Sequence, residues 1–277
     1  MSEFICPVCG GKLERCEKIY RCSVGHSYDI SKRGYVNLLM SQASSKKRHG
    51  DDTEMVNART RFLSLDKYSP LRDEVSRIVC NELYARGGGV IADIGCGECY
   101  YTEHISKALD ERKIAHQIYG IDISKKALDA AGRRKANIEL AVASAFSIPI
   151  AENCSDVIIN LFAPHEANEF FKIAKDNALL IRVFPLAKHL WELKCAVYDE
   201  PYENEIDTLD FDGFTLLYTK EMKYGIHLDT NRQILDLFSM TPYCYKTSSK
   251  DRAKLDNLDS LDTRVEFCIA VYRKTAK

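Results

Sequence analysis

Hydrophobic and polar positions follow two different periods along the chain, and each change of period marks a new element. Residues 53 to 65 and 70 to 85 carry apolar side chains at helical spacing, with Thr53 and Pro70 as the expected helix starts. Beyond them, short apolar runs rich in β-branched residues are typical of strands. Strands are expected at residues 89 to 94, 117 to 122, 138 to 143, 155 to 162, 178 to 184, 213 to 228 and 264 to 274.

Amphipathic segments separate most of these strands. Helices are expected at residues 100 to 110, 124 to 135, 166 to 175, 188 to 199 and 229 to 240. A strand followed by a helix and then by another strand is the unit from which parallel sheets are built. The pattern therefore predicts an α/β protein with a doubly wound, Rossmann-like sheet.

Composition excludes several protein classes. The chain has 277 residues, of which 45% are hydrophobic and 29% charged, and no apolar run approaches the ~20 residues that a membrane span requires. Its start, "MSEFICPVCG", lacks the basic and apolar regions of a signal peptide. We therefore expect a cytoplasmic protein without a membrane partner, in which disulfides are not expected.

Charge is unevenly distributed. The formal net charge is −1, but the first 50 residues hold nine basic and four acidic residues. A basic segment on a mildly acidic protein is most often used to contact phosphates.

Four residues near the start have the spacing of metal ligands. Cys6-x2-Cys9 and Cys22-x3-His26 are separated by twelve residues, which predicts a closed, tetrahedral, structural zinc site. Cys16 is an alternative ligand, although it has no paired turn. The module is either a folding staple or, with its basic residues and Tyr20, Tyr28 and Tyr35, a binder of looped RNA; the residues alone do not decide between them.

The stretch "DIGCGE" follows the strand at residues 89 to 94. Gly95 and Gly97 permit a tight turn and a close approach of a ligand, and Asp122 ends the next strand, where an acid can bind both hydroxyls of a ribose. A dinucleotide-dependent oxidoreductase would use a similar turn. Asp93 favours S-adenosylmethionine instead, because an acid repels a pyrophosphate but attracts the α-ammonium group of this cofactor.

With these elements in order, the chain resembles the RlmA family of 23S rRNA (guanine-N1)-methyltransferases along nearly its whole length. The motifs that carry the resemblance are the zinc cluster, "GYVNLL" (Gly34 to Leu39), Gly50, Asp51, Glu54, Met55, Ala58 and Arg59, "YSPLR" (Tyr68 to Arg72), Asp93 to Thr102, Ala163 and Pro164, "HLWELK" (His189 to Lys194) and "MTP" (Met240 to Pro242).

The resemblance implies a class I S-adenosylmethionine-dependent methyltransferase that acts on 23S rRNA. It implies that Cys6, Cys9, Cys22 and His26 hold zinc. It also implies that the cofactor site is lined by Tyr68, Gly97, Glu98, Asp122 and His189. Cys99 stands where the family usually has a glycine.

Guanine N1 carries a proton that must leave during methylation, so a proton acceptor and a donor to O6 are needed. We expect them at "NLFAPHE", where Asn160 would orient the base and His165 or Glu166 would accept the proton. Phe162 or Trp191 would stack on an exposed or flipped base.

We expect residues 1–33 to form a zinc-binding RNA-recognition module, residues 34–86 a connecting segment with helices, and residues 87–277 the methyltransferase domain. On this division, Cys22→Ser would unfold the module and leave cofactor affinity nearly unchanged. A small-molecule methyltransferase and a non-catalytic zinc RNA-binding protein are the rival interpretations. The oligomeric state is open, with a homodimer as the candidate assembly.

Overall fold

The computed structural model describes residues 2–40 and 53–275, which form two sheets. The smaller sheet consists of β1 (Glu14–Cys16), β2 (Ile19–Arg21) and β3 (Ser27–Asp29). The larger sheet has eight strands in the order β10-β11-β9-β8-β5-β6-β7-β4. These are β4 (Tyr35–Asn37), β5 (Gly89–Ile94), β6 (His116–Asp122), β7 (Glu139–Val142), β8 (Ser155–Leu161), β9 (Ala174–Pro185), β10 (Phe214–Leu228) and β11 (Leu261–Lys274).

The larger sheet confirms the predicted doubly wound architecture. Its strands from β4 to β9 run parallel, while β11 pairs antiparallel with both β9 and β10. Chain order reverses between β5 and β8, because β5 continues to β6 on one side and β8 lies on the other. Ligands of such sheets bind at this reversal, beyond the carboxyl ends of the strands.

Eight α-helices lie in the described ranges. They are α1 (Thr53–Leu63), α2 (Ser69–Arg86), α3 (Tyr100–Glu111), α4 (Lys125–Ala131), α5 (Ala167–Ile173), α6 (Trp191–Val197), α7 (Asn231–Ser239) and α8 (Ser249–Arg252). Thr53 begins α1 as predicted, and Pro70 stands in the first turn of α2, where its missing N–H costs nothing. The helix predicted to reach residue 175 ends at Ile173, because Ala174 already belongs to β9.

The two faces of the sheet are covered differently. On one face, α2, α3, α6 and α7 pack against alternate strand residues such as Ile91 and Val157. On the other face, Ala92 and Tyr119 belong to a core that contains α5 and also Phe4 from the N-terminal segment. The N-terminal segment, which contains the predicted zinc ligands, therefore covers part of this second face, where a doubly wound sheet usually has only helices.

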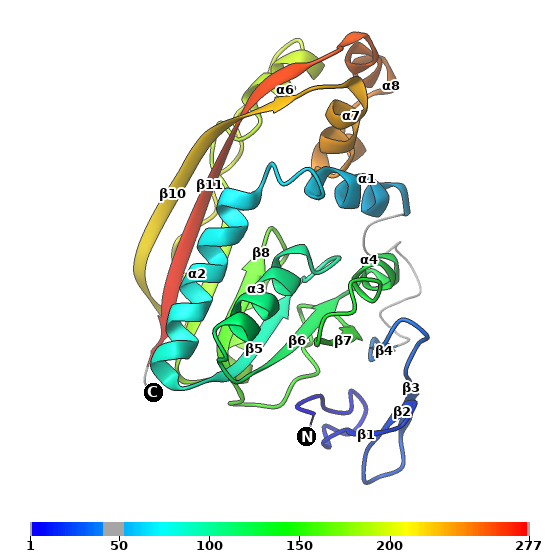
Figure 1. Cartoon of the computed structure of the whole chain (residues 1–277), viewed down its shortest axis with the longest axis vertical. Helices are drawn as coiled ribbons and strands as arrows, with labels where there is room; N and C mark the ends of the chain where they lie inside the picture. Colours follow the sequence, from blue (N-terminus) through cyan, green and yellow to red (C-terminus); the bar gives the residue numbers. More distant parts are fainter. Residues whose placement is uncertain (1, 41–52, 276–277) are drawn as a thin grey trace.

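A long hairpin and the small sheet mark two ends of the molecule. Figure 1 shows β10 and β11 curving along one side towards α7 and α8, with β1 to β3 at the opposite end. No helix within the described ranges is long and apolar enough to cross a membrane. The basic residues Lys46, Lys47 and Arg48 and the motif residues Gly50 and Asp51 lie outside the described residues.

Candidate functional site

The predicted metal ligands Cys6, Cys9, Cys22 and His26 lie together, with their ligand atoms within 4.8 Å of one another. Cys9 Sγ and Cys22 Sγ are 3.7 Å apart, and His26 Nδ1 is 3.5 Å from the sulfurs of Cys6 and Cys22. Tetrahedral zinc with its usual bond lengths requires edges of about 3.8 Å between two sulfurs and about 3.6 Å between sulfur and nitrogen. The residues fit zinc, with no fifth ligand from Cys16, which is exposed on β1.

Neighbouring groups support thiolate ligands. The hydroxyl of Tyr28 lies 3.0 Å from Cys6 Sγ, at hydrogen-bonding distance. Burial by itself raises the pKa of the Cys22 thiol, but hydrogen bonds from the backbone at His26 and Val24 and from Cys9 lower it to about 6. Hydrogen bonds to metal ligands orient the ligands and stabilise their charged form.

Tyr20 does not have the exposed position that stacking on RNA requires. It is buried, and its hydroxyl donates to Glu139 Oε2 at 2.7 Å, which ties the small sheet to the catalytic sheet. Tyr28 and Tyr35 are only half-buried. The exposed side chains of this region include six basic ones, Lys12, Arg15, Lys18, Arg21, Lys32 and Arg33, and three acidic ones, Glu14, Glu17 and Asp29.

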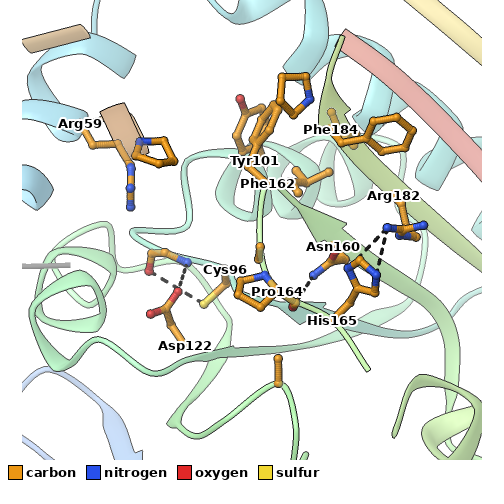
Figure 2. Close-up of a pocket in the computed structure, with 18 of the residues that line it drawn as sticks. Arg59, Cys96, Tyr101, Asp122, Asn160, Phe162, Pro164, His165, Arg182 and Phe184 are labelled. Atoms are coloured by element: carbon orange, nitrogen blue, oxygen red, sulfur yellow. Dashed lines mark hydrogen bonds between the residues drawn. The ribbon is translucent and has the colours of Figure 1, made fainter. Parts of the chain in front are cut away.

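A cavity of about 790 Å³ lies at the carboxyl ends of β5 to β9. This volume is in the upper part of the range of small-molecule sites, roughly 300 to 1,000 Å³. The cavity brings together the predicted cofactor-binding and catalytic residues Tyr68, Asp93, Gly95, Gly97, Glu98, Asp122, Asn160, His165 and His189, but Glu166, the alternative proton acceptor, does not line it. Figure 2 shows Asp122 on one side of the site and Asn160, His165 and Arg182 on the other.

The glycine turn after β5 has little space for side chains. Gly95 has φ +86°, and a Cβ at this position would come within 2.3 Å of the Ala163 Cβ. Gly97 donates its N–H to Asp122 Oδ2 at 2.9 Å, and Ser124 donates to Oδ1 at 2.8 Å. These two bonds hold the Asp122 carboxylate beside the glycine turn, where it lines the cavity.

Asp93 is buried at the end of β5. Thr102 Oγ1 donates to Asp93 Oδ2 at 2.5 Å. Burial raises the pKa of Asp93 to about 7, and the nearby charge of Asp122 adds to the effect of burial. A cationic ligand group placed here would restore the ionised form.

Glu98 follows the glycines but makes protein contacts. Arg134 Nη2 donates to Glu98 Oε1 at 2.7 Å, and the hydroxyl of Thr60 donates to Oε2. These bonds connect the glycine turn to α1.

Tyr68 and His189 lie against Phe267, with ring centroids 5.1 and 4.7 Å from the phenyl ring. His189 Nδ1 accepts a hydrogen bond from the Glu266 N–H at 3.1 Å. Burial and the charge of Lys194 lower the pKa of His189 to about 3, so its ring is neutral and presents Nε2–H as a donor.

The residues at the end of β8 and just after it have structural partners. Asn160 donates to the carbonyls of Ile94 and Pro164, at 2.9 and 3.3 Å, and so holds the ends of two strands together. Glu166 caps α5 by accepting from the Asn168 N–H. Phe162 is exposed and lines the cavity, whereas Trp191 does not line it.

Four charged lining residues are absent from the sequence predictions for the site: Arg59, Arg182, Glu205 and Asp207. Arg182 Nη2 lies 3.1 Å from His165 Nε2 and 2.5 Å from Asp207 Oδ2. A signal for Arg182 exists, since it is a lone charge within the apolar run "ALLIRVF", and buried charges are rare. Asp207 lies in an irregular polar segment and has no such signal.

Two family models match the chain. One, described as "RlmA, N-terminal", is a zinc ribbon and matches residues 4–47. The other is described as a methyltransferase domain and matches residues 91–177. The first covers the metal cluster and the second the glycine turn, Asp122 and the strands through β8.

Three related proteins have the same activity in their names. A protein of Micromonospora griseorubida, named as a 23S rRNA (guanine-N(1)-)-methyltransferase, is 33% identical over 68% of this chain and 67% of its own length. A Bacillus subtilis (strain 168) protein with the same activity in its name is 27% identical over 99% of this chain and 98% of its own. The 23S rRNA (guanine(748)-N(1))-methyltransferase of Streptomyces fradiae is 31% identical over 68% of this chain and 65% of its own.

Proposed function

Because the chain belongs to the RlmA family of 23S rRNA (guanine-N1)-methyltransferases, we propose that it methylates N1 of a guanine in a hairpin loop of 23S rRNA. The observation that carries this proposal is the continuous cavity at the ends of β5 to β9. One side of it has the glycine turn and acids of a cofactor site, and the other has polar groups suited to a base. Action on ribosomal RNA would place the enzyme in the cytoplasm; a homodimer stays a prediction.

We assign the cofactor to the side of the cavity formed by β5 and β6. Asp122 would accept from the ribose hydroxyls, Asp93 would face the α-ammonium group, and the turn at Gly95 and Gly97 would allow close approach. Glu98 would hold the turn in place, and Tyr68 and His189 would line the same site. When bound, S-adenosylmethionine supplies an electrophilic methyl group on a sulfonium.

The target base would then lie over β8 and β9. Phe162 is 43% exposed and lies 5.4 Å from the Phe267 ring, which makes it an available stacking surface for a base taken out of its loop. Asn160 would shape this part of the cavity. The exposed basic residues of the zinc ribbon would contact the phosphates that flank the loop.

Incubation of the protein with unmodified 23S rRNA and S-adenosylmethionine tests the proposal. Mass spectrometry of the digested nucleosides should show 1-methylguanosine. Asp122→Asn should lower cofactor affinity and product formation at least tenfold, while Asp110→Asn, an exposed change of the same kind, should leave both unchanged. Cofactor binding without methylated rRNA would instead favour a small-molecule substrate.

A further inference from the structure

Arg182 is a fully buried cation at the end of the cavity farthest from the glycine turn. It is 2% exposed and projects from β9, next to Asn160 of β8 in the strand register. The Phe211 ring lies 4.6 Å from its guanidinium carbon. Its position is therefore fixed by packing as well as by hydrogen bonds.

The guanidinium has five N–H donors, and its contacts use only some of them. Nη2 donates to Asp207 and His165, and Nη1 donates to the Thr208 carbonyl at 3.3 Å. Nε has no hydrogen-bond partner among the described residues. The Tyr272 hydroxyl, which likewise has no hydrogen-bond partner in the described part of the chain, interacts with Arg182 as well. Because Arg182 lines the cavity and keeps donor capacity beyond its protein contacts, it can donate to a ligand acceptor there.

Asp207 is the more exposed member of its ion pair with Arg182. Its side chain is 35% exposed, and among the described residues only Oδ2 has a partner, which is Arg182. The other carboxylate oxygen can accept a proton or a hydrogen bond from the cavity. The pair thus places a donor beside an acceptor.

Guanine presents the complementary pattern, because its O6 acceptor is next to its N1–H donor. Loss of the N1 proton puts negative charge on O6, and a fixed cation there stabilises that charge. This argument rests on the proposed function. We propose that Arg182 donates to O6 of the target guanine and that Asp207 accepts the proton from N1.

The step balances without another reactant. The proton moves from N1 to the Asp207 carboxylate, N1 forms a bond to the methyl carbon, and the electrons of the broken carbon–sulfur bond remain on sulfur.

His165 acts as a positioning residue in this arrangement. Its ring accepts from Arg182, so its lone pair is engaged and less available for the guanine proton. Burial and the charge of Arg182 lower the pKa of His165, which keeps the ring neutral. Further titratable groups interact with this cluster: Tyr272 with Asp207 and Arg182, Cys268 with Arg182, and Glu166 with His165. Glu205 lines the same cavity.

The pH dependence of methylation by Asp207→Asn tests the assignment. Near neutral pH the single-turnover rate should fall roughly 100- to 1,000-fold, because a general base contributes about this factor. As the pH rises, the ratio of the wild-type rate to the variant rate should decrease by nearly tenfold per pH unit, because guanine then loses its N1 proton to solvent. Asp210→Asn, in the same segment but outside the cavity, should keep the wild-type profile.

Arg182→Lys provides the second variant, since it retains a buried cation beside Asp207. It should lower the rate at least tenfold without changing cofactor affinity by more than about threefold. A wild-type rate in Asp207→Asn, or an equal loss at every pH, would overturn the inference while leaving the proposed function intact. If the wild-type protein makes no 1-methylguanosine at any pH, both fail together.

Discussion

Single residues in the cavity owe their properties to burial. Asp93 and His189 both lie in apolar surroundings, and burial favours the neutral form of each: it raises the pKa of the acid and lowers that of the histidine. The two shifts have different consequences. The His189 ring stays neutral at all ordinary pH values, whereas the Asp93 carboxyl changes its charge close to neutral pH.

Stability should therefore depend on pH through Asp93. In the unfolded chain an aspartate has a pKa of about 3.9, while burial raises the pKa of Asp93 to about 7 in the folded protein. Between these values the folded state holds a proton that the unfolded state has lost, so this group lowers stability as pH rises from about 4 to 7. Asp93→Asn should raise the free energy of unfolding by roughly 1 to 3 kcal/mol at pH 8 and by little at pH 4.5.

Urea denaturation at several pH values would measure this difference. Asn retains an oxygen that accepts from Thr102, so the hydrogen bond is kept. The exposed Asp110→Asn variant is the matched control and should show no such trend. A difference that is the same at every pH would contradict the assigned origin.

The sequence allowed us to predict the site residues that belong to a motif with a recognisable spacing. It did not allow us to predict the residues that reach the site only through the fold. Cys6, Cys9, Cys22 and His26 have a spacing that zinc geometry requires, and Gly95 and Gly97 stand in a recognisable turn. Asp207 becomes part of the cavity only because residues far apart in sequence fold together around Arg182. Tyr20 was one of the aromatic residues considered for RNA binding, but its ring packs edge-on against Phe4, with centroids 5.9 Å apart, and is buried there.

At the scale of elements, the zinc ribbon and the catalytic sheet share one core. Phe4 packs 5.1 Å from Tyr119 of β6, and β4 adds to the sheet beside β7. Glu139 joins the parts by accepting from Ser2 and Tyr20 of the N-terminal segment and from Gln117 of β6. Apolar periodicity correctly predicted seven of the eight strands of the larger sheet but not the three-residue β4. It also contains no information about which face of the sheet a metal module covers.

Loss of zinc should therefore destabilise more than the ribbon. Cys22→Ser should lower the melting temperature of the chain by roughly 6–12 °C, since a loss of about 3 kcal/mol is expected and each kcal/mol shifts a protein of this size by about 2–4 °C. The sequence alone predicted a local effect with cofactor affinity preserved. Because the ribbon and the larger sheet share one core, we expect Cys22→Ser to lower cofactor affinity as well.

Cys16→Ser is the control for that experiment, because Cys16 is exposed and outside the ligand cluster. Calorimetry of both variants, with zinc content measured in parallel, separates the outcomes. A low-temperature transition limited to the ribbon, with the main transition unchanged, would show that the two parts are independent.

The whole molecule has an uneven distribution of charge. Arg15, Lys18 and Arg21 are exposed on the zinc ribbon, while Lys220 and Lys223 on β10 form ion pairs with Glu74 and Glu221. Figure 1 shows β10 along one side of the molecule and the ribbon at the lower end on the opposite side. Exposed basic residues gathered on one end favour binding of a polyanion there.

Replacement of Arg15, Lys18 and Arg21 by Gln should weaken rRNA binding roughly 10- to 100-fold at physiological salt. The slope of log affinity against log salt should become less steep by about 0.7 for each phosphate that the variant no longer neutralises. Filter binding over a range of salt concentrations gives both quantities. The triple variant Arg77, Lys220 and Lys223 to Gln should retain the wild-type slope; equal decreases in both variants would point to a general charge effect.

The pairing of β4 with β7, and of Phe4 with Ile150, also sets an order of assembly during synthesis. The ribbon leaves the ribosome more than a hundred residues ahead of the strand and loop that it packs against. At ordinary translation rates this gap lasts on the order of ten seconds. The metal ligands can therefore bind zinc on the nascent chain. During this time the side chains of Phe4 and Tyr20 remain exposed to water, because the strands that they pack against have not yet been synthesised.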